Sequence, residues 1–227
     1  MGSIFGKITE EQPSYVVLRS CSTYDVRAYD EMCALETTYA SARGMVRGDQ
    51  GSSFMRLARY IGVLGRAEND ERRKIAMTAP VFMHRSTSVA KEGEGEGEGE
   101  GEGEGEGANA NANANAARET YAMSFVLPKS AFPGGARDAP APNDASVRVY
   151  DVAKRVMAAR TFSGRMCEEL IEKESRILRE AIDGDGLKRV GKSDAAIYAG
   201  YNPPWTPGWW RKNEVMYEIE RPEWATE

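Results

Sequence analysis

The sequence predicts an α+β fold: a distorted antiparallel β-barrel made of two similar halves, each with one packed helix. Short segments rich in β-branched and aromatic residues occur along most of the chain, and two amphipathic segments have helical spacing. The order of strands, one helix and further strands occurs twice, which indicates an internal pseudo-repeat. Short connections without regular β-α-β alternation favour antiparallel neighbours over a parallel sheet.

In the first half, the pattern predicts three strands, a helix and a further extended segment. The strands are expected at 15–18, 24–29 and 32–40, and the last extended segment at 74–83. Between Ser52 and Ile61, apolar side chains recur at helical spacing. This segment therefore predicts an amphipathic helix, with Ser52 or Ser53 as its N-cap.

A low-complexity insertion follows at 92–117, where Glu-Gly repeats give way to Ala-Asn repeats. Such a tract has no large apolar side chain to bury, so we expect it to be disordered and to bind nothing. Apolar patterning resumes at Met83 and Tyr121, which predicts that the insertion joins the two strands of a hairpin. The chain is then expected to form a single domain over 1–227, with the insertion as a surface loop.

The second half repeats the order of the first. Strands are expected at 121–128, within 147–161, at 195–200 and at 214–219, with a Pro/Gly/Asp-rich loop at 132–143. The segment 165–182 has an apolar face at helical spacing, and Asp183-Gly184-Asp185-Gly186 is a typical helix stop.

Composition argues against several classes of protein. The formal net charge is −5, the pI is about 5.3 and the basic residues are scattered, which argues against nucleic acid as a partner. No apolar run reaches the roughly 18 residues that a membrane span needs, and no signal or transit peptide is evident at the start. We therefore expect no membrane span and a cytoplasmic protein.

Motifs for catalysis are missing from the sequence. No G-x-S-x-G, H-E-x-x-H or strand-linked G-x-G-x-x-G occurs, so no catalytic residue is predicted and the protein is expected not to be an enzyme. The chain has three widely spaced cysteines, no C-x-x-C motif and one histidine, which argues against a zinc site. Metal ligands stay unassigned.

Four segments form a recognisable set: Tyr24-Asp25-Val26-Arg27-Ala28-Tyr29, Lys74-Ile75-Ala76-Met77-Thr78-Ala79-Pro80-Val81, Tyr121-Ala122-Met123-Ser124-Phe125-Val126-Leu127-Pro128, and Gly200-Tyr201-Asn202-Pro203-Pro204-Trp205. In this order and spacing they resemble the SOUL haem-binding family over almost the whole chain except the insertion. The resemblance implies a distorted barrel of two halves, no enzymatic activity, and binding of haem or a related tetrapyrrole in an apolar cleft beside the first helix. Some family members have been credited with an axial histidine at the position of Ala28, so this sequence departs from that pattern.

A tetrapyrrole site needs an apolar wall and a cationic rim for the propionates. The predicted first helix offers both, and the aromatic, proline-rich loop 201–210 is the expected second wall. The same helix face is also suited to packing on the sheet, and the loop is also suited to capping the barrel. The predicted ligand contacts are Phe54, Leu57, Ala58, Arg59, Ile61, Met77, Tyr201, Pro204 and Trp205.

Other interpretations stay open. His84, the only histidine, lies near the insertion and is expected to be exposed rather than an iron ligand. An effector-binding domain for cationic aromatic ligands, with Glu36 or Glu214 as the buried carboxylate, is one alternative to tetrapyrrole binding for buffering, transport or sensing. A protein-interaction module that uses the exposed face of the 165–182 helix is another.

Overall fold

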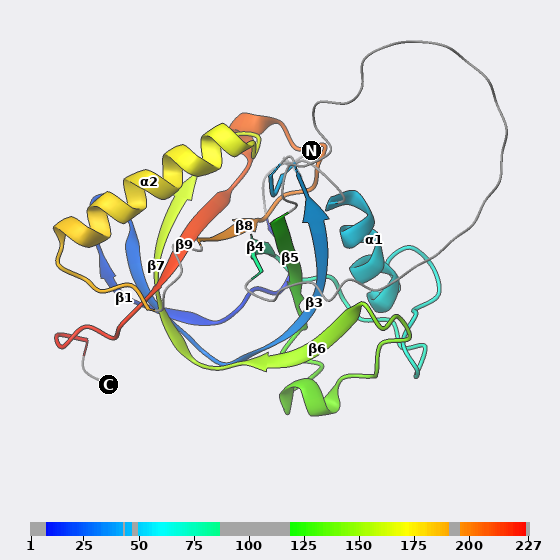
Figure 1. Ribbon diagram of the computed structural model, residues 1–227. Helices are drawn as coiled ribbons and strands as arrows, with labels where there is room; N and C mark the ends of the chain where they lie inside the picture. The colour runs from blue at the N-terminus through cyan, green and yellow to red at the C-terminus, as the bar shows by residue number, and fades with distance from the viewer. Residues whose placement is uncertain (1–7, 43, 47–49, 87–118, 191–195, 226–227) are drawn as a thin grey trace, which may run out of the picture.

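The computed structural model describes residues 8–42, 44–46, 50–86, 119–190 and 196–225, and these form one curved antiparallel sheet with two α-helices (Figure 1). The strands are β1 (Tyr15–Ser20), β2 (Asp25–Tyr29), β3 (Met32–Ser41), β4 (Val81–Arg85), β5 (Glu119–Val126), β6 (Val147–Val152), β7 (Arg155–Phe162), β8 (Ile197–Gly200) and β9 (Asn213–Ile219). The helices are α1 (Gln50–Ile61) and α2 (Glu168–Gly184), with short 3-10 helices η1 (Gly135–Asp138) and η2 (Gly208–Trp210).

The strand order shows that the sheet consists of two equivalent halves. From edge to edge the order is β1-β2-β7-β9-β8-β4-β5-β3-β6. Apart from β1, it is symmetric about the β8–β4 pairing, because β2, β7, β9 and β8 take the places of β6, β3, β5 and β4. The predicted α+β class and pseudo-repeat are therefore confirmed. The edge strands β1 and β6 do not pair with each other, so the sheet curves like a barrel without closing.

Each half carries one helix on the outer face of the sheet. α1 packs on β3 and β5, and α2 packs on β7 and β9, which are the counterparts of those strands (Figure 1). Leu57, Tyr60 and Phe125 belong to the buried cluster of the first half, and Leu178 and Ile182 to that of the second. The expected single packed helix in each half is confirmed.

A third buried cluster lies on the concave face, between the two halves. Successive side chains of a strand point to opposite faces, and the inward-pointing ones include Phe82, Val126, Met157, Ala199 and Met216. The halves are thus joined by apolar packing as well as by the β4–β8 hydrogen bonds.

The N-cap prediction for the first helix is wrong. α1 already includes Gln50, so Ser52 and Ser53 lie within its first turn. Ser53 is buried, and its hydroxyl accepts a hydrogen bond from Arg56 at 3.0 Å. Its role is therefore packing and hydrogen bonding on the sheet side of the helix.

The expected extended segment 74–83 contributes a strand only from Val81 onward. Before it, Thr78 makes a single bridge with Glu11, and no other ladder forms among residues 74–80. The second helix begins at Glu168, later than the expected 165, because the preceding residue Cys167 has an extended backbone.

The predicted insertion at 92–117 lies outside the described residues. Its flanks are described: Arg85 pairs with Tyr121 across the antiparallel β4–β5 ladder, and the backbone N–H of Ser86 donates to the carbonyl of Thr120 at 2.8 Å. The hairpin expected on either side of the insertion is therefore confirmed. In the described part of the chain, no helix has the length and apolar character needed to cross a bilayer.

Candidate functional site

The apolar face of α1 that sequence reasoning assigned to a ligand is used for packing. Leu57 and Ala58 are 0% exposed and Ile61 is buried, because this side of α1 lies on β3 and β5. These three residues cannot touch a ligand unless the helix moves off the sheet. Phe54 is half-buried and packs edge-on against Phe125, with 5.3 Å between the ring centroids.

The other predicted contacts divide between interior and surface. Met77 is half-buried against the core of the first half. Tyr201 is buried, and its hydroxyl donates to Glu214 Oε2 at 2.7 Å. Burial and the nearby Glu214 carboxylate raise the pKa of Tyr201, which keeps it a neutral donor. Arg59 and Pro204 are exposed.

The loop between β8 and β9 carries the most exposed tryptophan side chains among the described residues. Trp205 is 78% exposed, Trp209 is 75% exposed, and Trp210 is half exposed. Tryptophan has a broad π-face and few rotatable bonds, so it binds planar molecules at a small entropic cost. The loop therefore offers a surface suited to stacking.

Hydrogen bonds within the loop hold this aromatic surface in place. The Arg211 guanidinium donates from Nε to the Thr206 carbonyl at 2.8 Å, and it donates from Nη2 to the Pro204 carbonyl. The carbonyl of Pro207 accepts from the N–H of Trp210 at 3.0 Å, which closes the η2 turn. Arg211 thus serves as an internal brace of the loop.

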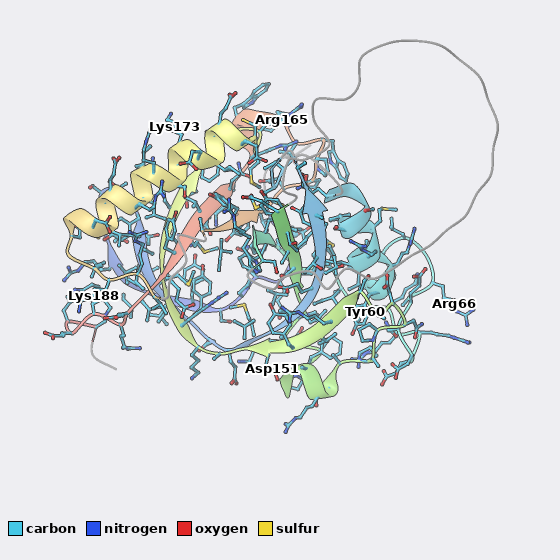
Figure 2. The ribbon with its side chains drawn as sticks, viewed as in Figure 1. Tyr60, Arg66, Asp151, Arg165, Lys173 and Lys188 are labelled. Atoms are coloured by element: carbon cyan, nitrogen blue, oxygen red, sulfur yellow. The ribbon has the colours of Figure 1, made fainter. Side chains whose placement is uncertain are left out.

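A second arginine lies beside this loop. The N–H of Gly164 donates to the carbonyl of Gly208 at 3.0 Å, so the turn before α2 touches the loop directly. The next residue, Arg165, is exposed and has no hydrogen-bond or ion-pair partner among the described residues. Figure 2 shows it at the end of α2 from which the helix starts. Burial, with repulsion from Arg165, lowers the pKa of Arg211, which is consistent with two neighbouring cations.

The start of α2 also touches the segment that leads into α1. The N–H of Val46 donates to Glu168 Oε1 at 2.7 Å. Gly44 has a φ of +94°, and a Cβ there would lie only 2.5 Å from the Glu168 carboxyl group. The positive φ favours glycine at position 44, and a side chain there would displace the Glu168 carboxylate from the Val46 N–H. The start of α2 and the turn before it thus contact both neighbouring segments: Gly164 touches the aromatic loop, and Glu168 touches the approach to α1.

Glu36 on β3 is a buried carboxylate with a complete set of donors. It accepts from Arg148 Nε at 3.1 Å and Nη2 at 2.5 Å, from the Tyr150 hydroxyl at 2.7 Å and from the Ser124 hydroxyl at 2.8 Å. Burial on its own would raise the pKa of Glu36, but these hydrogen bonds outweigh burial and lower the pKa. Its negative charge is therefore balanced within the protein.

Glu214 on β9 is balanced in the same way. It accepts from Arg27 Nη1 at 3.0 Å and from the hydroxyls of Tyr201 and Thr161, and Lys212 Nζ lies 3.2 Å away. Burial would raise the pKa of Glu214, but Arg27 and Tyr201 outweigh it and lower the pKa. A site for a cationic aromatic ligand needs an unpaired buried carboxylate, and neither candidate supplies one.

His84 is not in the exposed position expected for it. The alternation of β4 places it on the same concave face as Phe82, where it is half-buried. It lines a cavity of about 290 Å³ between the two halves, together with Tyr150 and Arg155. Burial lowers the pKa of His84, so its imidazole is neutral near pH 7.

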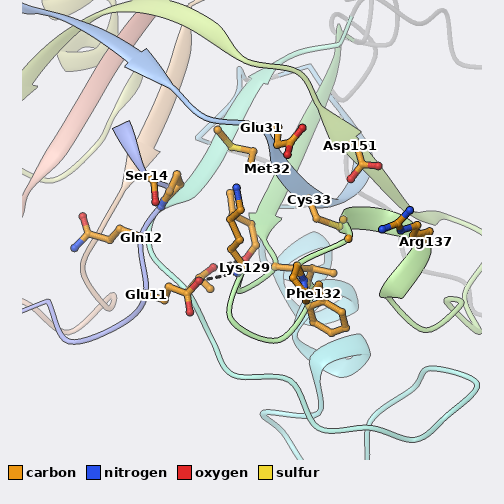
Figure 3. Close-up of a pocket in the computed structure, with 17 residues that line it drawn as sticks. Glu11, Gln12, Ser14, Glu31, Met32, Cys33, Lys129, Phe132, Arg137 and Asp151 are labelled. Atoms are coloured by element: carbon orange, nitrogen blue, oxygen red, sulfur yellow. Dashed lines mark hydrogen bonds between the residues drawn. The ribbon is translucent and has the colours of Figure 1, made fainter. Parts of the chain in front are cut away.

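A second cavity, of about 300 Å³, lies where the N-terminal segment passes β3 (Figure 3). Glu11 forms one side and accepts hydrogen bonds from the Lys129 backbone N–H at 2.7 Å and the Ser130 hydroxyl at 2.6 Å. Cys33 lines it, and burial, with repulsion from Asp151, raises the pKa of the thiol to about 12. The thiol is therefore protonated and a poor nucleophile.

The fold places the protein in a class of pseudo-twofold α+β proteins with an open antiparallel barrel. Solved structures with a similar fold include two that match most of the chain. The EcmrR C-terminal domain matches with a TM-score of 0.50 and 9% identity over 87% of this chain and 97% of that domain. A Listeria innocua protein described as a hydrolase matches with a TM-score of 0.50 and 9% identity over 87% of this chain and 92% of its own. At this identity the similarity concerns the fold alone.

The family model for the SOUL heme-binding protein matches residues 10–218, most of the chain. The chain therefore belongs to the SOUL heme-binding family, as its four sequence segments predict. Among curated proteins, none matches the chain.

Proposed function

We propose that this protein binds haem or a related tetrapyrrole on the aromatic loop 201–210, beside the start of α2, for buffering, transport or sensing. Family membership supports the class of ligand. The observation that carries the location is the exposed pair Trp205 and Trp209 on a loop whose Gly208 contacts the turn at Gly164. The next residue, Arg165, is a cation without a partner among the described residues. Tryptophan faces stack on the macrocycle, and an arginine pairs with a propionate.

Among the predicted contacts, Pro204, Trp205, Phe54 and Arg59 have surface that a ligand can reach. The buried residues of α1 fix that helix on β3 and β5 and are not part of the proposed contact surface. Met77 and Tyr201 contribute in the same indirect way, since one packs on the core and the other bonds Glu214.

The contribution of one tryptophan to haem affinity can be calculated from the side-chain area that the ligand would cover. A buried aromatic side chain removes about 150–250 Å² from water, and a ligand that covers roughly half of one exposed tryptophan would remove about 80 Å². At about 25 cal/mol per Å², this contributes about 2 kcal/mol, which is roughly a thirtyfold change in affinity.

The test is a haemin titration followed by the Soret band and by tryptophan quenching. Trp205→Ala and Trp209→Ala are each expected to weaken binding at least tenfold without lowering the melting temperature, because both side chains are exposed. Trp224→Ala is the matched control, because Trp224 is a partly exposed tryptophan that stacks under Arg19 of β1 and is not part of the aromatic loop. This variant is expected to leave haemin affinity unchanged.

Arg165→Ala is expected to weaken binding only a few-fold, and more at low than at high salt, because an exposed ion pair contributes about 0–1 kcal/mol. Wild-type affinity in both tryptophan variants, or a loss in Trp224→Ala alone, would contradict the proposed location. The absence of any Soret shift in the wild-type protein would contradict tetrapyrrole binding itself.

A further inference from the structure

The concave cavity between the two halves has a largely apolar wall. Met32, Phe82, Val126, Val152 and Ile197 line it, and they come from β3, β4, β5, β6 and β8. Both halves therefore contribute, and the cavity lies on the opposite face of the sheet from α1 and α2. It is separate from the aromatic loop, which does not line it.

Most polar side chains around this cavity already form hydrogen bonds or ion pairs within the protein. The hydroxyls of Ser124 and Tyr150 donate to Glu36. Arg85 is paired with Glu119 at 3.0 Å, and Glu218 lies 3.9 Å from Arg155. Two donors are left without a hydrogen bond among the described residues: the His84 imidazole and the Arg155 guanidinium.

Arg155 is poorly satisfied by the protein. Its Nε is buried and has no hydrogen-bond partner in the described part of the chain. Its Nη1 lies 3.9 Å from Glu218 Oε2, which is beyond hydrogen-bond distance. A buried donor without an acceptor costs about 1–3 kcal/mol, so its presence calls for an explanation. A ligand with acceptor oxygens supplies one.

We propose that this cavity is a second ligand site, one that takes a small carboxylic acid with an apolar body. The carboxylate would accept from Arg155 and from the N–H of a neutral His84, while the apolar part lies among Met32, Phe82 and Ile197. A neutral imidazole offers one donor and adds no repulsion to the guanidinium.

The size and charge of the cavity narrow the ligand class further. Its volume of about 290 Å³ is at the lower limit of pockets that enclose drug-sized molecules, about 300–1,000 Å³, which favours a ligand smaller than a tetrapyrrole. Two carboxylates bear on the choice of ligand: Glu36 is paired with Arg148, and Glu218, which lines the cavity, is partly exposed and lies 3.9 Å from Arg155. The buried Nε of Arg155 and the His84 imidazole therefore favour an anion over a cation. The site is therefore independent of the proposed tetrapyrrole function.

The single histidine gives this proposal a direct measurement. Because His84 is the only histidine, its ring-proton NMR signals need no assignment. Octanoate is the probe, octanamide is its neutral isostere, and octylammonium is its cationic counterpart. We expect octanoate to shift the His84 signals saturably, and octanamide and octylammonium to bind at least tenfold more weakly.

Arg155→Met is expected to weaken octanoate at least tenfold and to change octanamide binding by less than threefold. Arg137→Met is the matched control, since Arg137 is exposed and lines the other cavity, and it is expected to bind octanoate like the wild-type protein. Ala34→Leu narrows the cavity from β3 without removing a charge, so it tests the location even if Arg155→Met does not fold. It is expected to weaken octanoate at least tenfold.

Three outcomes would overturn the proposal: unmoved His84 signals with octanoate, equal affinity for octanoate and octanamide, or tighter binding of octylammonium. Wild-type octanoate affinity in folded Arg155→Met or Ala34→Leu would overturn the assignment of the site.

Discussion

Two arginines at equivalent positions of the pseudo-repeat are expected to differ widely in their contribution to stability. Arg27 and Arg148 each lie two residues before a tyrosine, on the counterpart strands β2 and β6, and each pairs with a buried glutamate. Their exposure differs: Arg27 is 4% exposed and Arg148 is 65% exposed. The perturbation that separates them is the replacement of each by methionine, which keeps much of the side-chain volume without the charge.

The magnitudes follow from what each replacement leaves behind. Removing one partner of a buried ion pair costs about 3–5 kcal/mol, because the other charge stays buried. In Arg27→Met, Glu214 keeps Lys212 and two hydroxyl donors, so the lower end, about 3 kcal/mol, is expected. In Arg148→Met, Glu36 also stays buried and keeps the Ser124 and Tyr150 hydroxyls. Because the lost guanidinium is 65% exposed, water takes its place beside Glu36, and about 1 kcal/mol is expected.

The assay is urea unfolding of both variants at pH 7, with thermal melting as a second readout. For a chain of this length, 1 kcal/mol corresponds to about 2–4 °C, so Arg27→Met is expected to melt about 6–12 °C lower and Arg148→Met about 2–4 °C lower. Adding Glu214→Leu to Arg27→Met is expected to recover much of the loss, because the unpaired charge is then removed. Equal costs for the two single variants would refute the reasoning from burial.

Three further outcomes are expected. Leu57→Asp should unfold the protein rather than reduce haemin binding selectively, because it buries an unpaired charge under α1; a folded variant in circular dichroism would contradict this. The pKa of Glu36 is lower in the folded than in the unfolded protein, so ionised Glu36 stabilises the fold above the unfolded pKa of about 4.3. This stabilisation is lost as pH falls through the folded pKa. Glu36→Gln should therefore flatten the dependence of the free energy of unfolding on pH below about pH 4, as measured by urea unfolding. Replacing 92–117 with a short Gly/Ser turn should leave the melting temperature and haemin affinity nearly unchanged, since the flanking strands pair directly, and a fall of many degrees would count against it.

The fold was predictable because its signals are local. The end of α2 is an example: Asp183-Gly184-Asp185-Gly186 predicts a helix stop, and in the structure Gly186 has a φ of +70° while its N–H donates to the carbonyl of Asp183. The pseudo-repeat was visible because each half repeats the same order of strands and one helix, a pattern that needs no knowledge of tertiary contacts.

The site was less predictable because it depends on pairing between distant segments. The periodicity of Leu57 and Ala58 is the same whether a helix face meets a sheet or a ligand, and only the packing on β3 and β5 decides between them. Arg165 lies beside Gly208 because β7 pairs with β9, a register that no local pattern specifies. Arg155 and His84 line the same cavity for a similar reason. The alternation of side chains along each strand and the position of the strand in the sheet determine which side chains face each other on the concave side.

The aromatic loop itself shows how exposure separates two interpretations that the sequence left open. A loop that only caps the barrel would turn its aromatic side chains inward, as Tyr201 does toward Glu214. Trp205 and Trp209 instead point to solvent, although Arg211 braces the same loop through two backbone carbonyls and keeps its shape fixed. Contiguous exposed apolar surface is unusual on a soluble domain unless something covers it. A braced loop that holds tryptophans in water therefore favours a ligand wall over a cap, and this preference does not depend on the family resemblance.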